Sequence, residues 1–312
     1  MTDSPYIIGN YQPADFDGYV RLLQEAERLE PLGRAVSPQS VAECLAWPNY
    51  SPEQDLFVVK KAGEIVGYMD VTPELGIGRV ILNCWLRPEH RGKGLAEKLV
   101  GYALRRAGEL GADVAHVNVR EDNTAASTAL TRLGFKCVRR FLEFKLDMNR
   151  LRWQEADRAA QECGYLREDE EEKLTLIQNR CFEGTWGYNP NTVATITYRT
   201  HLSHFSPDDV VLTGEGDKVT GYCWTEVTPS KDGREGRICM IGVDPDYRGR
   251  GIGRRVLLAG LAHLGSKGVR AAVLTVDSEN EAACALYRSV GFELRANSLW
   301  YEKAITQDAG TP

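Results

Sequence analysis

The feature that most constrains the fold of this chain is an internal repeat with an offset of 157 residues. Matched positions keep this one offset across almost fifty residues, which indicates a duplication and not a coincidence of composition. The matched positions are Pro88 and Pro245, Arg91 and Arg248, Gly94 and Gly251, Ala96 and Gly253, Asn123 and Asn280, and Gly134-Phe135 and Gly291-Phe292. The chain of 312 residues therefore contains the same folding unit twice, and each half is long enough to bury its own core.

Each copy carries a glycine-dense turn between a strand and a helix. Glycines lack a Cβ atom, so they let the backbone adopt positive φ and come close to a ligand. The turn also leads into the N-terminus of a helix, where backbone N–H groups and the helix dipole favour an anion such as a diphosphate. The turn residues are Arg248, Gly249, Arg250, Gly251, Ile252 and Gly253 in the second copy, and Arg91, Gly92, Lys93, Gly94, Leu95 and Ala96 in the first. Taken alone, the turn is equally compatible with a glycine-rich loop that carries solvated arginines.

The order of these motifs resembles that of the GCN5-related N-acetyltransferase (GNAT) family. In both copies an Arg-x-x-Gly-x-Gly/Ala loop is followed by a helix, a strand, an Asn, a second helix and a Gly-Phe pair. The tandem arrangement resembles the mycothiol synthase-like, two-domain members of that family. The resemblance implies an α/β (α+β) protein of two tandem GNAT folds, each a mixed, mostly antiparallel sheet flanked by helices. It also implies that acetyl-CoA is the acyl donor and that the loop binds it.

We expect the two copies to be joined by a helical segment. Leu151, Trp153, Ala156 and Ala160 suggest a helix in this part of the chain. The expected parts are an N-terminal domain at 1–147, a linker at 148–164, a C-terminal domain at 165–305 and a polar tail at 306–312. Each domain is expected to close with two short strands, at 135–138 and 143–146 in the first copy and at 292–294 and 299–303 in the second.

Charge and composition argue against several classes of protein. The net charge of −6 disfavours general binding to nucleic acid. The longest apolar run is far too short to span a membrane, and no signal segment opens the chain. The eight cysteines form no Cys-x-x-Cys pair, so we expect free thiols in a reducing cytoplasm and no bound metal. The expected partner is a small-molecule amine, and the protein is expected to be a monomer or a homodimer.

The resemblance also implies how the thioester is held. In the family, two central strands splay apart, and the backbone of the strand before the loop binds the pantetheine arm and polarises the carbonyl. Those residues here are Ile241, Gly242 and Val243. Gly242 suits such a gap because a glycine inside a strand often marks a close approach of backbone, and preset amide donors stabilise a developing oxyanion. The alternative is that Gly242 is only a small residue beneath a helix.

The residue that protonates the leaving thiolate distinguishes the two copies. Tyr287 follows Asn280 by seven residues, two turns along one helix face. The resemblance assigns Tyr287 to the sulfur of coenzyme A, where a phenol can donate a proton, and Asn280 to the acetyl-CoA site. The alternative for Tyr287 is an aromatic core residue. The first copy has Leu130 at the matching position, which cannot donate a proton, so that copy is expected to hold acetyl-CoA without catalysis or to serve as a scaffold.

The base that deprotonates the amine is the least defined part of the expected site. In mycothiol synthase-like relatives an acidic residue lies on the strand before the loop, but Arg237 stands at that position here, which argues against mycothiol synthesis itself. Glu226 is the best substitute and Glu235 the second, although each also fits a surface carboxylate. Tyr301 matches a tyrosine of the same subfamily and is a further candidate for proton transfer. The segment at 179–190 resembles a subfamily loop that would roof the acceptor site, or it packs on the sheet.

These features predict an acetyl-CoA-dependent N-acetyltransferase that acts on a primary amine of a small molecule, with its active site in the second copy. Two alternatives stay open at this point. One is a non-catalytic tandem protein that binds or senses acetyl-CoA. The other is an acetyltransferase that acts on a peptide or protein amine.

Overall fold

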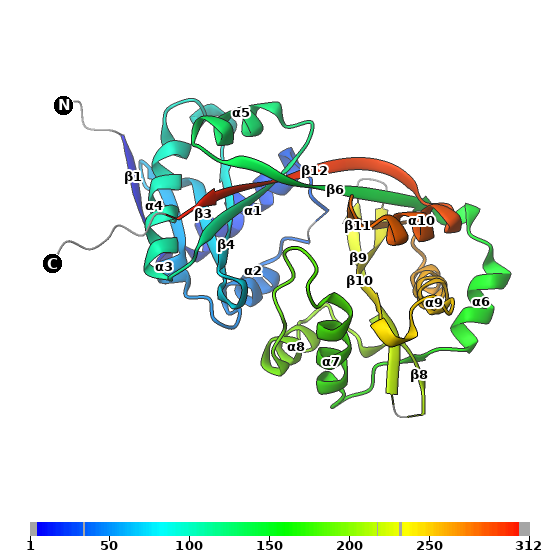
Figure 1. Ribbon diagram of the computed structural model, residues 1–312. Coiled ribbons are helices and arrows are strands. Elements are labelled where there is room, and N and C mark those ends of the chain that lie inside the picture. Colours follow the sequence, from blue (N-terminus) through cyan, green and yellow to red (C-terminus); the bar gives the residue numbers. More distant parts are fainter. Residues whose placement is uncertain (1–4, 34, 217, 231–232, 306–312) are drawn as a thin grey trace. The chain divides into compact units, whose positions relative to one another are not determined.

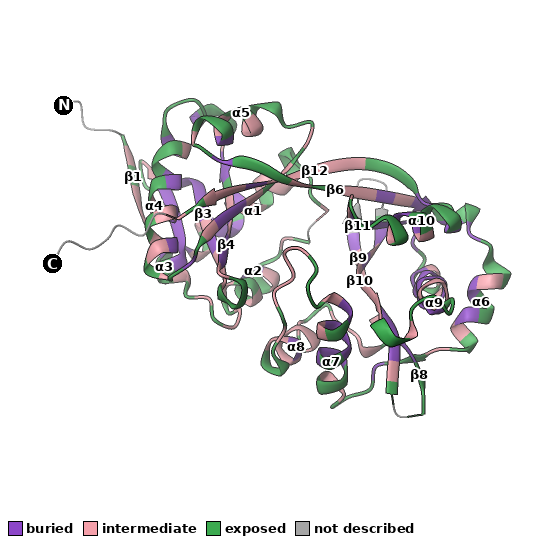
Figure 2. Ribbon diagram, in the orientation of Figure 1, coloured by how far each residue is buried: buried purple, intermediate pink, exposed green. Residues whose placement is uncertain are grey.

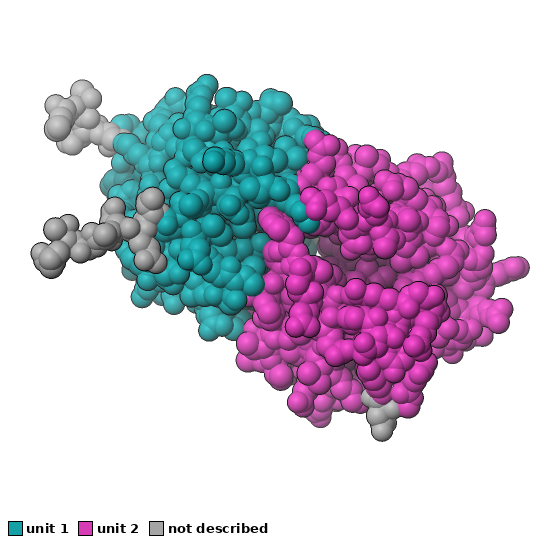
Figure 3. Space-filling view, in the orientation of Figure 1, with its two compact units in different colours: residues 1–139, 299–312 teal, residues 140–298 magenta. Residues whose placement is uncertain are grey.

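The computed structural model describes residues 5–33, 35–216, 218–230 and 233–305, so the expected tail at 306–312 lies outside the described residues. The chain divides into two compact units (Figure 3). Unit 1 comprises residues 1–139 and 299–312, and unit 2 comprises residues 140–298. Each unit contains a mixed, mostly antiparallel sheet with helices against it, as the sequence predicts (Figure 1). Across the described residues, no helix is long and apolar enough to cross a membrane.

In unit 1 the strand order is β1-β2-β3-β4-β5-β12. Neighbours from β1 to β4 are antiparallel, whereas β4 and β5 are parallel. The strands are β1 (Tyr6–Asn10), β2 (Leu56–Lys61), β3 (Glu64–Glu74), β4 (Arg79–Leu86), β5 (Val114–Arg120) and, through its residues 299–304, β12 (Glu293–Ala304). The helices are α1 (Phe16–Leu29), α2 (Pro38–Leu45), α3 (Pro52–Asp55), α4 (Leu95–Glu109) and α5 (Thr124–Arg132), with 3-10 turns η1 (Pro13–Asp15), η2 (Leu75–Ile77) and η3 (Pro88–His90).

In unit 2 the strand order is β6-β11-β10-β9-β8-β7. Only β10 and β11 run parallel among these neighbours. The strands are β6 (Lys136–Asp147, from residue 140 in this unit), β7 (Gly164–Tyr165), β8 (Val210–Glu215), β9 (Lys218–Ser230), β10 (Gly233–Val243) and β11 (Ala271–Asp277). The helices are α6 (Trp153–Gln161), α7 (Glu171–Phe182), α8 (Val193–Thr200), α9 (Ile252–Ser266) and α10 (Glu281–Val290), with 3-10 turns η4 (Met148–Arg150), η5 (Pro207–Asp209) and η6 (Pro245–Tyr247).

The two faces of the unit 2 sheet are covered by different helices. Alternate residues of a strand point to opposite faces, and β9 follows this rule. Its Cys223 packs on the α9 side in one hydrophobic cluster, whereas Tyr222 and Trp224 pack on the α7–α8 side in another. Figure 2 shows that burial is concentrated on the central strands and on the helices that cover them. We call the surface of the sheet that bears Tyr222, Trp224 and Glu226 the α7–α8 face.

The parallel central strands of both units separate after three residue pairs. β10 and β11 pair over 236–238, and among the described residues β10 then continues to Val243 without pairing to β11. On its other side β10 stays paired to β9 as far as Val243, with a register shift between Ile238 and Met240. β4 and β5 likewise pair only over 79–81. Each unit therefore has the splay of central strands that the family resemblance implies.

The segment expected to be a linker is part of the core of unit 2. It contains α6, which is helical as expected, and Ala156 and Ala159 of this helix are buried in the same cluster as α9. The Trp153 ring lies so close to Gly265 of α9 that a Cβ atom there would collide with it. Burial of this apolar face makes 148–164 a structural element and not a connector.

The closing strands also differ from the expectation. The two short strands expected in each copy are one long strand each, β6 and β12. β6 pairs with β11 over 141–147, so unit 2 starts at residue 140 and the expected boundary at 147 does not coincide with it. Residues 299–304 of β12 lie in unit 1, where Glu302 binds His116 of β5 at 2.9 Å. Each unit is thus completed by a strand from the other copy of the repeat.

Candidate active site

The loop of unit 2 has the geometry of an anion cradle. Gly249 and Gly251 adopt φ of 78° and 77°, and Gly251 caps α9 in the left-handed conformation. A Cβ atom at either glycine would meet no other atom within 4 Å, so the space in front of the loop is open. The first N–H groups of a helix have no partner within the helix. A diphosphate that approaches this loop therefore meets backbone donors and the positive end of the α9 dipole.

The corresponding loop of unit 1 has the same backbone. Gly92 and Gly94 both adopt φ of 71°, Gly94 caps α4, and a Cβ atom at either position would again meet open space. The duplicated sequence motif therefore corresponds to a duplicated local structure, including the positive φ that favours glycine.

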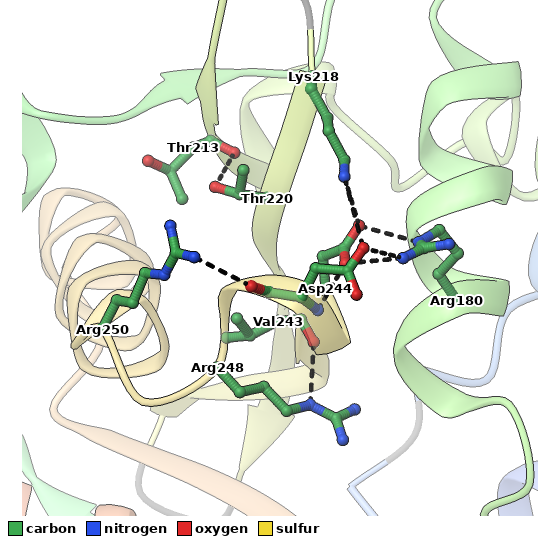
Figure 4. A network of polar contacts seen from close by, with 9 residues as sticks. Arg180, Thr213, Lys218, Thr220, Val243, Asp244, Arg248 and Arg250 are labelled. Carbon is green, nitrogen blue, oxygen red and sulfur yellow. Dashed lines mark hydrogen bonds and ion pairs between the residues drawn. The ribbon is translucent and has the colours of Figure 1, made fainter.

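Arg248 and Arg91 have a structural role that the sequence did not reveal. Arg248 donates from Nε to the Val243 carbonyl at 3.3 Å (Figure 4) and from Nη2 to the Cys181 carbonyl at 2.9 Å. Arg91 donates from Nε to the Leu86 carbonyl at 2.9 Å, the same bond in the other copy. Each arginine side chain closes the loop onto the end of the preceding strand. Both arginines were expected at the diphosphate site, but their side chains form hydrogen bonds to backbone carbonyls of the protein instead.

Two further arginines around the cradle, Arg250 and Arg254, also have contacts within the protein. Arg250 lies 4.9 Å from the Tyr247 ring centroid and donates to the Asp246 carbonyl at 3.3 Å (Figure 4). Arg254 binds Glu155 of α6 at 2.8 Å, and this contact lowers the pKa of Glu155. Part of the positive charge at the start of α9 is thus paired with Glu155 of α6, which leaves the backbone N–H groups as important donors in the cradle.

A buried carboxylate fixes the end of β10 to α7. Arg180 donates from Nε and Nη2 to the two oxygens of Asp244 at 2.9 and 3.0 Å, and Lys218 lies 3.6 Å from the same group (Figure 4). Asp244 is only 1% exposed, and the bonds from Arg180 hold its pKa below the ordinary value. Unit 1 has this junction with the charges reversed, since Arg87 stands at the matching position and binds Glu25 at 2.8 Å and Glu64 at 3.2 Å.

Gly242 is required by packing. A Cβ atom there would lie 2.7 Å from Cβ of Cys181 and 3.0 Å from Cε1 of Tyr222. The glycine therefore lets α7 approach the strand, which is the alternative that the sequence left open. The adjacent residues Ile241 and Val243 continue the strand beyond its pairing with β11, and alternate residues of a strand direct their N–H and C=O groups to opposite sides. The backbone of this segment remains suited to binding an extended pantetheine arm.

Asn280 and Asn123 are helix caps. Oδ1 of Asn280 accepts from the Ala283 N–H at 3.1 Å, and Oδ1 of Asn123 accepts from the Ala126 N–H at 3.1 Å. Such a cap typically contributes about 1 kcal/mol to helix stability. The repeated asparagine is thus explained by the fold, and its amide group keeps further donors and a second lone pair on Oδ1.

Tyr287 is almost buried, and its hydroxyl lacks a partner. The residue is 5% exposed, and its ring lies 6.3 Å from that of Phe144 and 6.0 Å from that of Phe292, measured between centroids. No hydrogen bond to the Tyr287 hydroxyl exists among the described residues. Burial raises its pKa, so the phenol keeps its proton at neutral pH. The ring thus fills the core while the hydroxyl stays able to donate. In unit 1 the matching Leu130 is simply a buried core residue.

The carboxylates considered for the base are in different environments. Glu226 is half-buried on the α7–α8 face, where it accepts from Sγ of Cys239 at 3.4 Å and lies 3.8 Å from Nε2 of His204. Glu235 is 7% exposed, and its carboxylate is already engaged by two cations, Arg295 at 2.8 Å and Lys145 at 3.4 Å. Glu226 is therefore the better candidate for accepting a proton.

Tyr301 lies in unit 1, whereas the other candidate residues of the active site lie in unit 2. It is 7% exposed in the core of unit 1, in the cluster that contains Leu130. The structure thus brings Tyr287, Glu226 and the loop of Arg248–Gly253 into one unit and leaves Tyr301 in the other. The loop at 183–190 is tied to α7, since the Tyr188 hydroxyl donates to Oδ1 of Asn179 at 2.7 Å and the Tyr188 ring stacks on Phe182.

One residue of the α7–α8 face was not expected from the sequence. Arg199 of α8 lies over Trp224 of β9, with the guanidinium carbon 4.2 Å from the ring centroid. An arginine in a short helix gives no sequence signal of such a position, because the aromatic partner is distant in the chain.

Comparisons with known proteins agree with this geometry. A model of the Acetyltransferase (GNAT) family matches residues 20–135 and 152–292. The mycothiol acetyltransferase of Amycolatopsis mediterranei is 29% identical over 248 residues, which are 77% of this chain and 81% of that protein. The mycothiol acetyltransferase of Nocardia farcinica is 30% identical over 241 residues, which are 74% of this chain and 76% of that protein.

Two solved structures have the same fold along the whole chain. A GCN5-related N-acetyltransferase from Sphaerobacter thermophilus superposes with a TM-score of 0.71 at 22% identity and covers 98% of this chain and 97% of its own. A tandem GNAT protein from the clavulanic acid biosynthesis pathway also gives 0.71, at 14% identity, and covers 98% and 99%. The splayed strands, the two glycine cradles and the family match on both halves lead to one conclusion: the chain belongs to the GNAT family as a tandem N-acetyltransferase, for which acetyl-CoA is the acyl donor.

Proposed function

We propose that this acetyltransferase transfers the acetyl group of acetyl-CoA to the primary amine of a small molecule, and that the reaction takes place in unit 2. The observation that carries the proposal is the contrast at one helix position. Both units have the strand gap and the glycine cradle, but only α10 offers a phenol, Tyr287, where α5 has Leu130. The unit with a proton donor is the one in which a thiolate can leave as a thiol.

The proposed reaction uses three groups of unit 2. Glu226 accepts a proton from the ammonium form of the acceptor, and the neutral amine nitrogen then attacks the carbonyl carbon of the thioester. The carbonyl electron pair moves to oxygen, where N–H groups of β10 stabilise the negative charge. When the intermediate collapses, the C–S bond breaks, the sulfur takes the proton of Tyr287, and the nitrogen releases its remaining extra proton to solvent to give the neutral amide. The products are the N-acetylated amine and free coenzyme A, and Tyr287 regains its proton from solvent.

The test is an assay for free coenzyme A with acetyl-CoA, a panel of small amines and a set of lysine-containing peptides. We expect release that depends on a small amine and is reduced by Tyr287→Phe. If no amine gives release above hydrolysis, the protein binds or senses acetyl-CoA instead. If only peptides give release, the acceptor class is wrong.

Unit 1 is proposed to bind acetyl-CoA without catalysing transfer. Its cradle has the same glycine φ angles and the same arginine-to-strand bond as unit 2, while Leu130 removes the acid. The relatives are mycothiol acetyltransferases, but Arg237 replaces the acidic residue expected at that position. We therefore propose an acceptor other than the mycothiol precursor. The eight cysteines are free thiols, which supports the proposal that the protein acts in a reducing cytoplasm.

A further inference from the structure

The α7–α8 face of unit 2 carries a cation in an unusual setting. Tyr222, Trp224 and Glu226 lie at alternate positions on this side of β9, and the guanidinium carbon of Arg199 from α8 lies over the Trp224 ring, 4.2 Å from its centroid. A guanidinium group held over an aromatic ring by a cation–π contact still has N–H donors that can bind an anion. Arg199 can therefore receive a planar or tetrahedral anion at these donors.

Arg199 has no anionic partner among the described residues. The ionisable groups around it are Cys239, Tyr222, Glu226 and Tyr188, named in order of their electrostatic effect on Arg199. Of these only Glu226 is a carboxylate, and its two oxygens face Cys239 and His204. Burial lowers the pKa of Arg199. A cation withdrawn from water without a partner is costly, so the arrangement is explained if a ligand supplies the missing anion.

Two further donors on this face are unsatisfied. The hydroxyl of Tyr222 and Nε2 of Gln178 are both buried and have no hydrogen-bond partner among the described residues. Tyr222 lies beside Gly242, at the strand that is expected to hold the thioester. Buried polar groups are nearly always bonded, so the unsatisfied Tyr222 hydroxyl, which is close enough to interact electrostatically with the unpaired Arg199, points to an absent acceptor of hydrogen bonds.

A second guanidinium makes the face positive. Arg237 of β10 stands directly opposite Glu226 in the β9–β10 register, and residues in such a pair lie on the same face. No ion pair to Arg237 exists within the described residues. Arg199 and Arg237 thus stand near Glu226, while Glu235, two residues before Arg237 on the same strand, is already paired with Arg295 and Lys145. Figure 3 shows the surface of unit 2 hollowed near its middle, in the region where β9 and β10 lie in Figure 1.

We propose that the acceptor is an amine that also carries an anionic oxygen group, a carboxylate or a phosphate, and that Arg199 binds this group while the amine faces Glu226. The inference deepens the proposed function and rests on it. Arg199 acts in acceptor binding and takes no part in proton transfer, so its loss should affect KM much more than kcat. The acetyl-CoA cradle follows the C-terminal end of β10 and shares no residue with this site, so its binding of acetyl-CoA should be unaffected.

The experiment compares amines that differ only in the anion. One pair is an α-amino acid and its carboxamide, and the other is glucosamine 6-phosphate and glucosamine. For the wild type we expect kcat/KM to be at least about 10-fold higher for the anionic member of one pair than for its neutral partner. Which of the two pairs shows this preference identifies the bound anion as a carboxylate or a phosphate. Arg199→Gln should raise KM for that member by about 10- to 100-fold and leave the neutral member unchanged. Arg199→Lys should restore part of the preference, and Arg132→Gln, an exposed arginine of unit 1, is the matched control.

Equal rates within both pairs, or an equal loss for both members in Arg199→Gln, would overturn the proposal. If the wild type acetylates none of the four amines, the anion site is tested by measuring the binding of the acetylated products, which does not depend on turnover. The N-acetylated amino acid, its carboxamide, N-acetylglucosamine 6-phosphate and N-acetylglucosamine are titrated calorimetrically into protein saturated with coenzyme A. Preferential binding of a charged product that is lost in Arg199→Gln supports an anion site even though transfer has failed. Absence of such preferential binding overturns the inference.

Discussion

Phe144 and Tyr287 lie ring beside ring, with centroids 6.3 Å apart, although they come from different copies of the sequence repeat. The reciprocal pair is Tyr301, which stands 157 residues after Phe144, and Leu130, which stands 157 residues before Tyr287. These two share the core of unit 1. The repeated glycines show the same exchange, because each lies against a closing strand from the other copy. A Cβ atom at Gly291 would lie 3.4 Å from Cδ1 of Leu146, and one at Gly134 would lie 3.5 Å from Nζ of Lys303. The closing strands are therefore exchanged between the copies.

Because the closing strands are exchanged, we predict that the second copy of the repeat neither folds nor catalyses acetyl transfer when it is produced without the first copy. A fragment of residues 165–305 would lack α6 and the part of β6 that pairs with β11, so the Tyr287 side chain would lose its contact with Phe144. We expect this fragment to be insoluble or unfolded by circular dichroism, and to lack transfer. A soluble fragment with full activity would contradict the exchange.

A point substitution tests the same contact within the whole chain. Phe144 is 1% exposed, and truncation of a buried phenylalanine typically costs about 3–5 kcal/mol. Phe144→Ala should therefore destabilise unit 2 and lower transfer, although residue 144 belongs to the first copy. Phe144→Leu should retain much of both. Denaturant unfolding followed by tryptophan fluorescence measures the loss, and unchanged stability in Phe144→Ala would refute the contact.

The Tyr287 hydroxyl is expected to matter for rate and not for folding. It makes no hydrogen bond within the described residues, so Tyr287→Phe removes no bond from the free protein. We expect kcat to fall by about 10- to 100-fold, because a positioned general acid is lost but water can replace it in part. Affinity for acetyl-CoA and the melting temperature should change little.

The control for this prediction is Leu130→Tyr in unit 1. It places a phenol at the matching position but provides no acceptor site, so it should not add activity in a Tyr287→Phe background. Full kcat in Tyr287→Phe with a good acceptor would make the phenol a packing residue, and the proton would have to come from another group.

The two cradles can be distinguished by matched glycine substitutions. A valine at Gly251 or at Gly94 meets the same obstacle, because each glycine has φ above 70° and a side chain would project toward the open front of the loop. We expect wild-type protein to bind two acetyl-CoA molecules by calorimetry and each single variant to bind one. Transfer should be lost only in Gly251→Val. Two bound molecules in Gly251→Val would show that the loop does not bind the diphosphate.

The local elements of this fold are predictable because local chemistry determines them. The glycines at 249 and 251 are separated by one residue and precede an apolar helix, which is the pattern of a left-handed cap, and α9 begins there. The cradles follow from motifs that recur in both copies, whereas the strand splay is implied only by the resemblance to the family. These features depend on residues within one stretch of chain.

The exchange of strands and the roles of the arginines could not be predicted in this way. The alternating residues of β6 suit an exposed or a paired strand, but nothing in them specifies β11 as the partner. Arg248 resembles a phosphate ligand in the sequence, yet its side chain binds the carbonyl of Cys181, which is 67 residues away. Arg199 likewise acquires its position only from Trp224, on a strand that follows it in the chain. Contacts between distant segments determine all three.

The junction at Asp244 predicts how unit 2 responds to acid. Arg180 and Lys218 hold the pKa of this buried carboxyl below its ordinary value. A group whose pKa falls on folding stabilises the fold above its unfolded pKa, about 3.9 for aspartate, and the contribution is lost as pH falls through the folded pKa. We therefore expect part of the stability of unit 2 to disappear below about pH 4.

Asp244→Asn isolates this contribution, since the amide cannot ionise. The variant should be less stable than wild type by about 1–3 kcal/mol at pH 7, because the charged bonds to Arg180 are replaced by weaker ones. The difference should shrink as pH falls below about 4, where the wild-type carboxylate takes up its proton. Urea unfolding between neutral and acid pH measures both curves, and Asp246→Asn is the control, because the Asp246 carboxylate is 67% exposed. A difference between wild type and Asp244→Asn that does not depend on pH would mean that the junction stabilises unit 2 through packing and not through its charge.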